Sequence, residues 1–441
     1  MYNFHTVIPN QFVLPRRISR LGQLAYNLWW TWGPEASRLF LRIDPILWEK
    51  TYHNPIRFLT QVDPVHLKGL TQDRYFLDHY DRVMRSFDDY IRPSETWFSR
   101  AHSERRGQVV AYFSSEFGLH ETMPIYAGGL GVLSGDHVKG ASDVGLPMVS
   151  IGFLYTQGYF TQHISEDGWQ EARYQRLKFE EMPVLPLIDE KGLPLTVSVE
   201  LPGRNVLARL WEVRVGRVPL YLLDSDVDGN TPWDRELTSR LYISDLDLRI
   251  SQEIILGIGG VRALRQLGYN PDIWHMNEGH SAFMALERAR ELVAGGMTFT
   301  EAAEQVRKSS VFTTHTPVPA GSDEFPHWLI DKYFSNLWPQ LGLDREQFID
   351  LARNRTPWGA ETFSMPILAL RHANQRNGVS ELHGQVARKM WNYLWPDLPE
   401  TEVPITHITN GVHTGTWLAR RLRALFERSL GAGWMEHMDD P

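Results

Sequence analysis

Four glycines fall within residues 128 to 135, directly ahead of a helix-compatible stretch at residues 137 to 144. Glycines allow a backbone to turn tightly and to approach a ligand, and the free N–H groups at a helix start attract anions. The loop therefore predicts a phosphate site, although a plain tight turn would also account for the glycines. It fits neither the P-loop pattern nor Gly-x-Gly-x-x-Gly, because Gly135 comes one residue too late.

Polar residues follow three strand-like runs farther along the chain. They are residues 275 to 280 (His-Met-Asn-Glu-Gly-His), 313 to 317 (Thr-Thr-His-Thr-Pro) and 409 to 413 (Thr-Asn-Gly-Val-His). Because an α/β sheet borders its ligand crevice with the carboxyl ends of its strands, this recurrence predicts one shared site. Taken singly, Asn277 could cap a helix, and His315 could be a buried imidazole with satisfied hydrogen bonds.

Other common catalytic patterns are not found. The spacing of His275 and His280 does not match His-Glu-x-x-His, and no Gly-x-Ser-x-Gly elbow occurs, so we expect neither a zinc site nor that class of hydrolase. Neighbouring carboxylates could in principle form a glycosidase pair, but adjacent side chains point in different directions, which favours solvated loop charges. The pairs in question are Asp323/Glu324, Asp226/Asp228 and Glu166/Asp167.

The elements that position these residues divide into two parts. Helical periodicity from residue 16 to 86 predicts a small helical N-terminal module over residues 1–100. Over residues 101–441, apolar strand-like runs alternate with helical stretches, which predicts an α/β domain with a mainly parallel sheet. The apolar stripe of the module comprises Leu21, Leu24, Ala25, Leu28 and Trp29, the strand-like runs are residues 109–113, 149–154, 220–223, 273–276 and 311–314, and two helical stretches are 249–267 and 281–293.

A hairpin is predicted beside this sheet. Residues 206–213 and 218–223 flank Gly216, and Pro219 within the second run indicates an edge strand, because proline cannot donate to a sheet ladder. Residues 224–234, rich in Asp, Gly, Asn and Pro, are expected to form an exposed loop.

Composition narrows the class of protein. A chain of 441 residues is long enough for two domains, and its apolar (42%) and charged (22%) fractions are those of ordinary globular proteins. The net charge of −8 without any basic block makes nucleic acid an unexpected partner. The absence of cysteine excludes disulfides, thiolate nucleophiles and Cys-ligated zinc. No secretory signal and no membrane-spanning apolar run is visible, so we expect a cytoplasmic protein with no membrane partner.

Several longer stretches together resemble one known family. The chain is similar to the N-terminal half of bacterial α-glucan phosphorylases, the glycogen and maltodextrin phosphorylase family. The resemblance covers nearly the whole chain. The stretches that carry it are residues 28–32 (Leu-Trp-Trp-Thr-Trp), 113–119 (Phe-Ser-Ser-Glu-Phe-Gly-Leu), 128–136, 158–160, 167–170, 249–253, 277–280, 315–317, 382–384 and 410–413.

The resemblance implies a fold, an activity and a cofactor. The fold would be the first of two Rossmann-like domains of a GT-B glycosyltransferase, preceded by the helical module and lacking the C-terminal cofactor domain. The family activity is phosphorolysis of an α-1,4-glucan end to glucose 1-phosphate with retained configuration. It uses pyridoxal phosphate bound to a lysine, and the cofactor's phosphate acts as acid/base partner to the substrate phosphate. Glucan and phosphate would therefore be the partners.

The resemblance also assigns residues. The backbone of Gly128, Gly129, Leu130 and Gly131 would face the reacting phosphate and sugar, where N–H donors stabilise developing charge, and Gly129 and Leu130 would also contact the cofactor. His315 would contact the glucosyl unit. Asn277, His280, Asn377 and Asn410 lie at the cleft by motif position, without individual roles.

The sequence departs from the family pattern in some places. A histidine expected three residues before the Asn-Gly-Val turn at 377–379 is Asn374 here, and His372 lies two positions earlier, so that role is left unassigned; Ser322 and Glu324 differ as well. None of the eight lysines lies in a matching cofactor motif, so we expect the isolated chain to be inactive.

Some alternatives stay open. A sugar-nucleotide glycogen or starch synthase shares the architecture and a glycine-rich loop, and a non-catalytic glucan-binding fragment could use the aromatic side chains. The sequence does not distinguish a truncated, a split or an incompletely recorded enzyme. It also leaves open a separate C-terminal chain as partner and a homo-oligomer.

Overall fold

The fold is described from a computed structural model, which covers residues 4–8, 12–33, 35–92, 95–318, 321–355, 361–431 and 433–436. Its first part is a bundle of short helices. These are α1 (Leu21–Ala25), α2 (Ala36–Ile43), α3 (Pro45–Lys50), α4 (Pro55–Gln61), α5 (Pro64–Leu70), α6 (Arg74–Ile91) and α7 (Trp97–Ala101).

Local sequence explains where these helices begin. Asp44, Asn54 and Asp63 each accept an N–H of the first helical turn with the side chain, and each is followed by a proline at the first helical position. The predicted apolar stripe of the module is confirmed, because all five of its side chains are buried against neighbouring helices.

The second part is built on a sheet of eleven strands among the described residues. Its path is β1-β6-β8-β9-β3-β2-β10-β11-β15-β16, with β7 paired to β8. From β9 to β16 all neighbours are parallel, which confirms the predicted α/β class with a mostly parallel sheet. The parallel strands are β2 (Val110–Phe113), β3 (Met148–Phe153), β9 (Val218–Asp224), β10 (Ile273–Asn277), β11 (Ser310–Thr314), β15 (Gln375–Gly378) and β16 (Thr406–His407).

The order of these strands creates a crevice. After β2 the chain adds β3 and β9 on one side, and then crosses to add β10, β11, β15 and β16 on the other side. Strand order therefore reverses between β2 and β10. At such a point the connections leave in opposite directions from two adjacent strands, which opens space outside their carboxyl ends.

The predicted hairpin is present, but its edge position is wrong. Strand β8 (Arg204–Val215) pairs antiparallel with β9, and β9 pairs on its other side with β3, so β9 lies inside the sheet. Pro219 is tolerated because the ladder with β3 begins only at Leu220. The loop after β9 is also less exposed than expected, because Asp224 and Asp234 are buried at its two ends.

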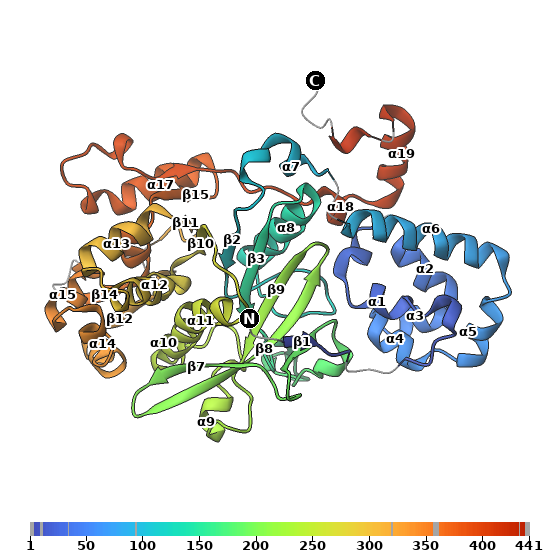
Figure 1. The fold of residues 1–441 in the computed structure, drawn as a ribbon, viewed down its shortest axis with the longest axis horizontal. Helices are drawn as coiled ribbons and strands as arrows, with labels where there is room; N and C mark the ends of the chain where they lie inside the picture. The colour runs from blue at the N-terminus through green and yellow to red at the C-terminus, as the bar shows by residue number, and fades with distance from the viewer. Residues whose placement is uncertain are drawn as a thin grey trace.

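Antiparallel strands extend the sheet beyond β9. They are β1 (Phe4–Thr6), β6 (Leu185–Asp189) and β7 (Thr196–Leu201). Strand β1 pairs with β6, so the start of the chain joins the sheet before the helices of the module begin, as Figure 1 shows near its centre. The boundary near residue 100, between a helical module and an α/β domain, stays a prediction.

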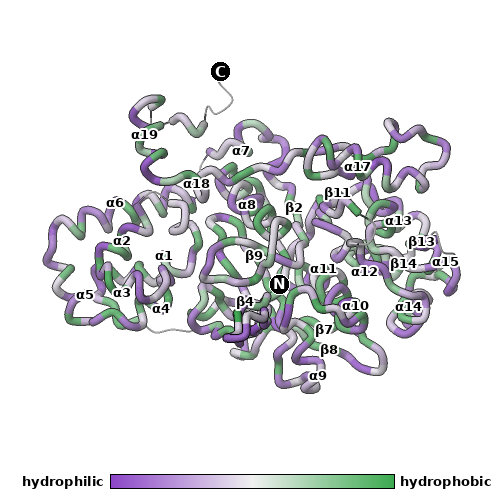
Figure 2. The backbone as a smooth tube through the Cα atoms, turned by 180° about the vertical axis from the view of Figure 1, so that it is seen from behind, coloured by the Kyte–Doolittle hydropathy of each residue, from purple (hydrophilic) through white to green (hydrophobic). Residues whose placement is uncertain are grey.

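Helices pack on the sheet. Helix α8 (Gly129–Val144) contacts β3, β8 and β9. The predicted helix at 249–267 is α10 (Leu246–Ile254), a π-helical segment (Ile255–Gly259) and α11 (Gly260–Gln266) in succession, and it contacts β3 and β7. Figure 2 shows hydrophilic stretches along outer helices such as α5 and α19.

The remaining elements complete the fold, and several of the helices among them add buried side chains to the same hydrophobic core. The helices are α9 (Pro232–Arg235), α12 (Phe283–Ala294), α13 (Phe299–Lys308), α14 (His327–Phe334), α15 (Arg345–Asp350), α16 (Met365–His372), α17 (Glu381–Trp391), α18 (Thr414–Trp417) and α19 (Arg420–Leu430). Strands β4 (Thr161–Ile164) and β5 (Gln170–Arg173) form a hairpin, and β12 (Glu324–Pro326), β14 (Glu361–Ser364) and β13 (Arg353–Arg355) form a small sheet. Among the described residues, none of the helices has the length and apolar character needed to cross a membrane.

Candidate functional site

The glycine loop leads into the amino end of α8. Gly128 is the residue before the helix and has no side chain to cap it, and a Cβ added at Gly128 or Gly129 would meet open space. Gly131 and Gly135 are different: a Cβ would lie 2.6 Å from Glu116 Oε2 at the first and 2.0 Å from the Gly118 carbonyl oxygen at the second. The first two glycines therefore leave the backbone open, and the last two permit close packing.

Some of the backbone N–H groups of this loop already donate to a buried carboxylate. Glu116, 1% exposed, accepts the N–H of Ala127 at 2.7 Å and that of Gly128 at 3.3 Å, and it also accepts the Tyr242 hydroxyl. The amide of Gly128 is thus already satisfied within the protein. By helix geometry the N–H groups of the next three residues, 129 to 131, have no carbonyl partner in the preceding turn. They are the donors that remain for an anion.

The predicted residues Asn277 and His315 lie together at the crevice. The Asn277 amide donates to Ser114 Oγ (3.2 Å) and to Ser134 Oγ (3.0 Å), and Ser134 lies on α8. Its carbonyl oxygen is 2.7 Å from His315 Nε2, so that nitrogen carries the proton when the amide is oriented in this way. Burial lowers the pKa of His315, which keeps the imidazole neutral. This network joins the helix that starts at the glycine loop to the ends of β10 and β11.

Glu278 holds the segment that carries His315. Its Oε2 accepts the N–H of His315 (2.8 Å) and both the N–H (3.1 Å) and hydroxyl (3.0 Å) of Thr316, and its Oε1 accepts the N–H of Gly279 (2.8 Å). The backbone of Glu278 has φ 79° and ψ 166°, a region that is essentially reserved for glycine. The four hydrogen bonds that its carboxylate accepts hold this strained residue in place.

The other predicted residues are placed less uniformly. His280 is beside the cluster, where its Nε2 accepts the Ser115 N–H at 3.0 Å and burial lowers its pKa to about 4. Asn377 lies on β15, beside β11. It is 7% exposed, and its side chain accepts the Thr313 hydroxyl. Asn410 is exposed, and its N–H donates to the Val379 carbonyl.

A cavity of about 230 Å³ opens at this crevice. Leu130 of the glycine loop, Glu278 and His280 line it, together with Arg249 and Glu253 of α10. Burial raises the pKa of Glu253 to about 8 against a weaker opposing effect of Arg249, so the carboxyl is largely protonated at neutral pH. Its Oε2 has no hydrogen-bond partner among the described residues.

The neighbouring carboxylates that were predicted to be solvated loop charges lie in different surroundings. Asp323 lines the cavity and forms an ion pair with Arg249, whereas Glu324 accepts bonds from Asn354 and Thr362 outside it. Asp226 is not a solvated charge but pairs with two arginines, Arg176 and Arg235. Glu166, Asp167 and Asp228 are exposed.

A larger open groove of about 1230 Å³ lies elsewhere. Residues 273–274, 309–311 and 374–375 line it, at the amino ends of β10, β11 and β15. Because the reversal of strand order opens its crevice at the carboxyl ends, we assign the site to the smaller cavity. Asn374 is thus at the far end of β15 from Asn377, and His372 is buried at the end of α16 with Nδ1 2.9 Å from the Leu368 carbonyl oxygen.

The third predicted motif, residues 409–413, contacts α8 and does not face the cavity. His413 is 6% exposed, and its Nε2 lies 2.9 Å from Asp143 of α8. Trp417 donates its indole N–H to Asp136, also on α8. This part of the chain fixes the helix that presents the glycine loop.

Lys139 is the buried lysine of this region. Burial lowers its pKa to about 8, and the amine donates to the Leu119 carbonyl (2.7 Å) and to Thr416 Oγ1 (3.0 Å). At 1% exposure it is not accessible to an aldehyde, and the other lysines are exposed. Among the described residues no cluster of three or more His, Asp or Glu side chains could hold a metal ion.

Two carboxylates of the site were not predicted as functional. Glu116 and Glu278 each fall inside a stretch that resembles the family, but no local pattern marks an isolated carboxylate as the acceptor of several backbone N–H groups. A third carboxylate, Glu253, ends the resembling stretch 249–253 on α10, and no local pattern marks it as functional either.

Comparison with known proteins finds several relatives that are named as phosphorylases. Residues 14–123 match a family described as a protein of unknown function (DUF3417). Over 97% of the chain, 43% of residues are identical to maltodextrin phosphorylase of Thermococcus litoralis, of which the alignment covers 50%. Glycogen phosphorylase of Mycobacterium tuberculosis is 44% identical over 92% of the chain (49% of that protein), and that of Aquifex aeolicus is 40% identical over 95% (59% of that protein). The chain thus spans about half the length of these relatives.

Proposed function

We propose that this chain, which is 40–44% identical to glycogen and maltodextrin phosphorylases over most of its length, is a member of that family and supplies one wall of the active site of an α-glucan phosphorylase. The observation that carries the proposal is the Ser134–Asn277–His315 network, which joins the helix of the glycine loop to two strand ends. The cavity beside it is lined by Leu130, Glu278 and Thr316 of these three segments. The activity would be that of a longer assembly, because the chain corresponds to about half of each relative.

We propose that the sheet is the first Rossmann-like domain of a GT-B glycosyltransferase. The first six of its seven parallel strands follow the spatial order third, second, first, fourth, fifth, sixth, which is the order of dinucleotide-binding folds, and β16 follows beside the sixth. The second domain would face the cavity and close the cleft.

In this proposal the chain binds sugar and stabilises charge. A phosphate oxygen replaces the glycosidic oxygen at C1 of the terminal glucose, and the departing glucan oxygen takes a proton. The N–H groups of Gly129, Leu130 and Gly131 would donate to the phosphate, since they are fixed by the helix and need no reorganisation. His315, held neutral and oriented by Asn277 and Glu278, would bind the glucosyl unit.

The proposed cofactor is pyridoxal phosphate, and the described residues fit one part of its site. The open space over Gly128 and Gly129 would let an anionic group approach the helix start, with Gly129 and Leu130 as its contacts. A Schiff base requires an accessible, desolvated amine, and Lys139 is desolvated but sealed. The lysine would therefore come from the second domain. When bound, the group supplies a phosphate that exchanges a proton with the substrate phosphate.

Complementation tests this proposal. The chain is mixed with a polypeptide that corresponds to the part of the Thermococcus litoralis relative it does not cover, and glucose 1-phosphate is measured after addition of maltoheptaose, phosphate and pyridoxal phosphate. We expect turnover only from the mixture, and its loss in His315→Ala. Turnover by the chain alone would refute the need for a second domain.

The same assay separates the alternatives. A sugar-nucleotide synthase would elongate maltoheptaose with ADP-glucose and would ignore phosphate. A non-catalytic glucan-binding fragment would bind maltoheptaose without turnover in any mixture.

A further inference from the structure

The tripeptide Asn-Gly-Val occurs twice in this chain, at residues 377–379 and 410–412. Asparagine is a thermolabile residue type, and a following glycine favours reaction of its side-chain amide with the main chain, because no Cβ obstructs the glycine nitrogen. The two copies lie side by side, since the carbonyls of Gly378 and Val379 accept the N–H groups of Ile408 and Asn410, each at 3.0 Å. The same short sequence therefore occurs in two surroundings that can be compared directly.

The first copy is locked inside the sheet. Asn377 and Gly378 belong to β15, which pairs with β11 on one side and with β16 on the other. The Asn377 carbonyl oxygen accepts the Thr313 hydroxyl at 3.0 Å, and its amide donates to the Gly378 carbonyl at 3.2 Å. A Cβ at Gly378 would lie 2.9 Å from His383 Nδ1, so the surroundings are closely packed. The Asn377 side chain can therefore reach the Gly378 nitrogen only when the strand opens.

The second copy lies on the surface. All three of its residues are exposed, and they belong to no helix or strand. Within the part of the chain that the structure describes, the Asn410 side chain and the Gly411 N–H form no hydrogen bond. A Cβ added at Gly411 would meet nothing within 4 Å. The side-chain carbonyl carbon of Asn410 and the nitrogen of Gly411 can therefore approach each other without displacing a neighbour.

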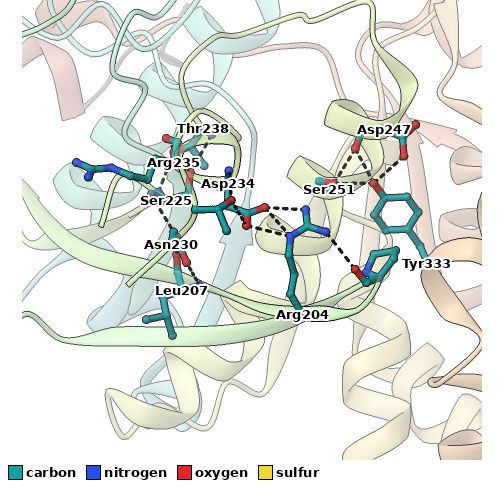
Figure 3. A network of polar contacts seen from close by, with 12 residues as sticks. Arg204, Leu207, Ser225, Asn230, Asp234, Arg235, Thr238, Asp247, Ser251 and Tyr333 are labelled. Carbon is teal, nitrogen blue, oxygen red and sulfur yellow. Dashed lines mark hydrogen bonds and ion pairs between the residues drawn. The ribbon is translucent and has the colours of Figure 1, made fainter. Parts of the chain in front are cut away.

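A position in a loop does not by itself leave an asparagine unprotected. Asn230 lies in the loop between β9 and α9, but its carbonyl oxygen accepts the Leu207 N–H at 2.9 Å. Its amide donates to the carbonyls of Leu207 (2.7 Å) and Ser225 (2.8 Å), as Figure 3 shows. The next residue, Thr231, also places a branched side chain beside its nitrogen. Asn410 has neither form of protection.

We propose that Asn410 is a site of spontaneous deamidation, which proceeds through a cyclic imide formed with Gly411. The Gly411 nitrogen loses its proton and attacks the side-chain carbonyl carbon of Asn410. A C–N bond forms there, and the side-chain nitrogen leaves with a proton as ammonia. Water then breaks one of the two C–N bonds of the imide ring, which leaves aspartate or isoaspartate at position 410. The net reaction consumes one water molecule and releases one ammonia molecule.

The isoaspartate product changes the main chain as well as the charge. In this product the chain runs through the former side chain, so one additional carbon atom lies between position 410 and Gly411. The segment is held on both sides, by the Asn410 N–H on the Val379 carbonyl and by the His413 N–H on Asp136 of α8 at 3.2 Å. A longer link between these two contacts should displace His413 and loosen the hold of this segment on α8.

The test is a time course of the folded 441-residue chain in mildly alkaline buffer. Proteolytic peptides that contain position 377 or 410 are weighed, because replacement of the amide by a carboxylate changes their mass. We expect position 410 to convert at least about tenfold faster than position 377, since tenfold requires only about 1.4 kcal/mol for opening β15. In urea, where neither copy is protected, the two positions should convert at similar rates.

Gly411→Ala is the matched variant. Its added Cβ meets open space, so the fold should be kept, but the methyl group obstructs the attacking nitrogen and should slow conversion at position 410 severalfold. Absence of conversion at position 410 in the folded chain, or equal rates at both positions before unfolding, would overturn the proposal. Conversion that is unaffected by Gly411→Ala would overturn the imide route.

Thermal stability tests the consequence for the main chain. Asn410→Asp carries the charge of the product on a normal main chain, and we expect it to melt at the temperature of the parent chain. The aged chain, which contains isoaspartate, should melt at a lower temperature. Equal melting temperatures of the aged chain and of Asn410→Asp would overturn the predicted loosening of His413.

Discussion

Replacing Glu278 by glutamine should destabilise the protein and disturb His315. The carboxylate accepts four hydrogen bonds, three on Oε2 and one on Oε1, at 2.8 to 3.1 Å. A glutamine has one acceptor oxygen, so its amino group would face the donor on the other side. At 8% exposure, water cannot freely replace the lost acceptor.

The magnitude follows from these contacts. One buried donor left unsatisfied costs about 1–3 kcal/mol, and three charge-assisted bonds become neutral ones, so we expect a loss of about 2–4 kcal/mol in the free energy of unfolding. The strained backbone is unchanged by this substitution. Glu278→Gly would relieve a strain of about 1–3 kcal/mol but lose all four bonds, so it should also be destabilising.

Urea denaturation of the chain measures the loss, and the ring ¹⁵N shifts of His315 report whether its protonated nitrogen stays on Asn277. Glu324→Gln is the matched control, because the carboxylate of Glu324 accepts its bonds, among the residues that the structure describes, from the side chains of Asn354 and Thr362. A cost below about 0.5 kcal/mol in Glu278→Gln, with unchanged His315 shifts, would refute the positioning role, since that is the range of neutral surface substitutions.

Three further predictions concern the same site. Gly131→Ala and Gly135→Ala should each cost about 1–3 kcal/mol or more by overpacking, whereas Gly128→Ala should stay within about 0.5 kcal/mol, as measured by urea denaturation. Burial raises the pKa of Glu253 from 4.5 to about 8, so the unfolded chain releases this proton first and stability falls as pH rises through that range; Glu253→Gln should gain stability relative to the parent between pH 5 and pH 8, and an equal difference at both pH values would contradict this. Asn277→Ala should lower the free energy of unfolding by about 2–4 kcal/mol, because it removes a buried side chain that forms three hydrogen bonds. Asn410→Ala, at an exposed position, is the control and should leave thermal stability unchanged.

The sequence predicts the parallel part of the sheet well. Runs such as residues 109–113 and 273–276 are short, mainly apolar and bounded by polar segments, which is typical of strands in a sheet that helices cover. The prediction of an edge strand at Pro219 was wrong. The preference of proline for sheet edges is a local signal, and it cannot reveal that the pairing of β9 with β3 begins one residue later, at Leu220. Strand β1 was not predicted either, because its three residues are too few to show a pattern.

The site was predicted in part for the same reason. Asn277 ends β10 and His315 directly follows β11, so the parallel pairing of these two strands brings them together. Glu116 and Glu253 gain their environment from distant segments: Glu116 from residues 127, 128 and 242, and Glu253 from the closure of the cavity over α10. His413 shows the reverse, a polar residue after a strand that turns to a neighbouring helix.

The pairing of β1 with β6 has a mechanical consequence. The helices from α1 to α7 leave the sheet through β1 and return to it through β2, so they form a closed excursion with both ends woven into the same sheet. A single proteolytic nick within these helices would release neither piece while the sheet stays folded. For the same reason, a force that pulls on the residues at β1 would first have to break the hydrogen bonds between β1 and β6, before it acted on any helix. This three-residue strand therefore anchors the amino-terminal end of the helical region to the sheet.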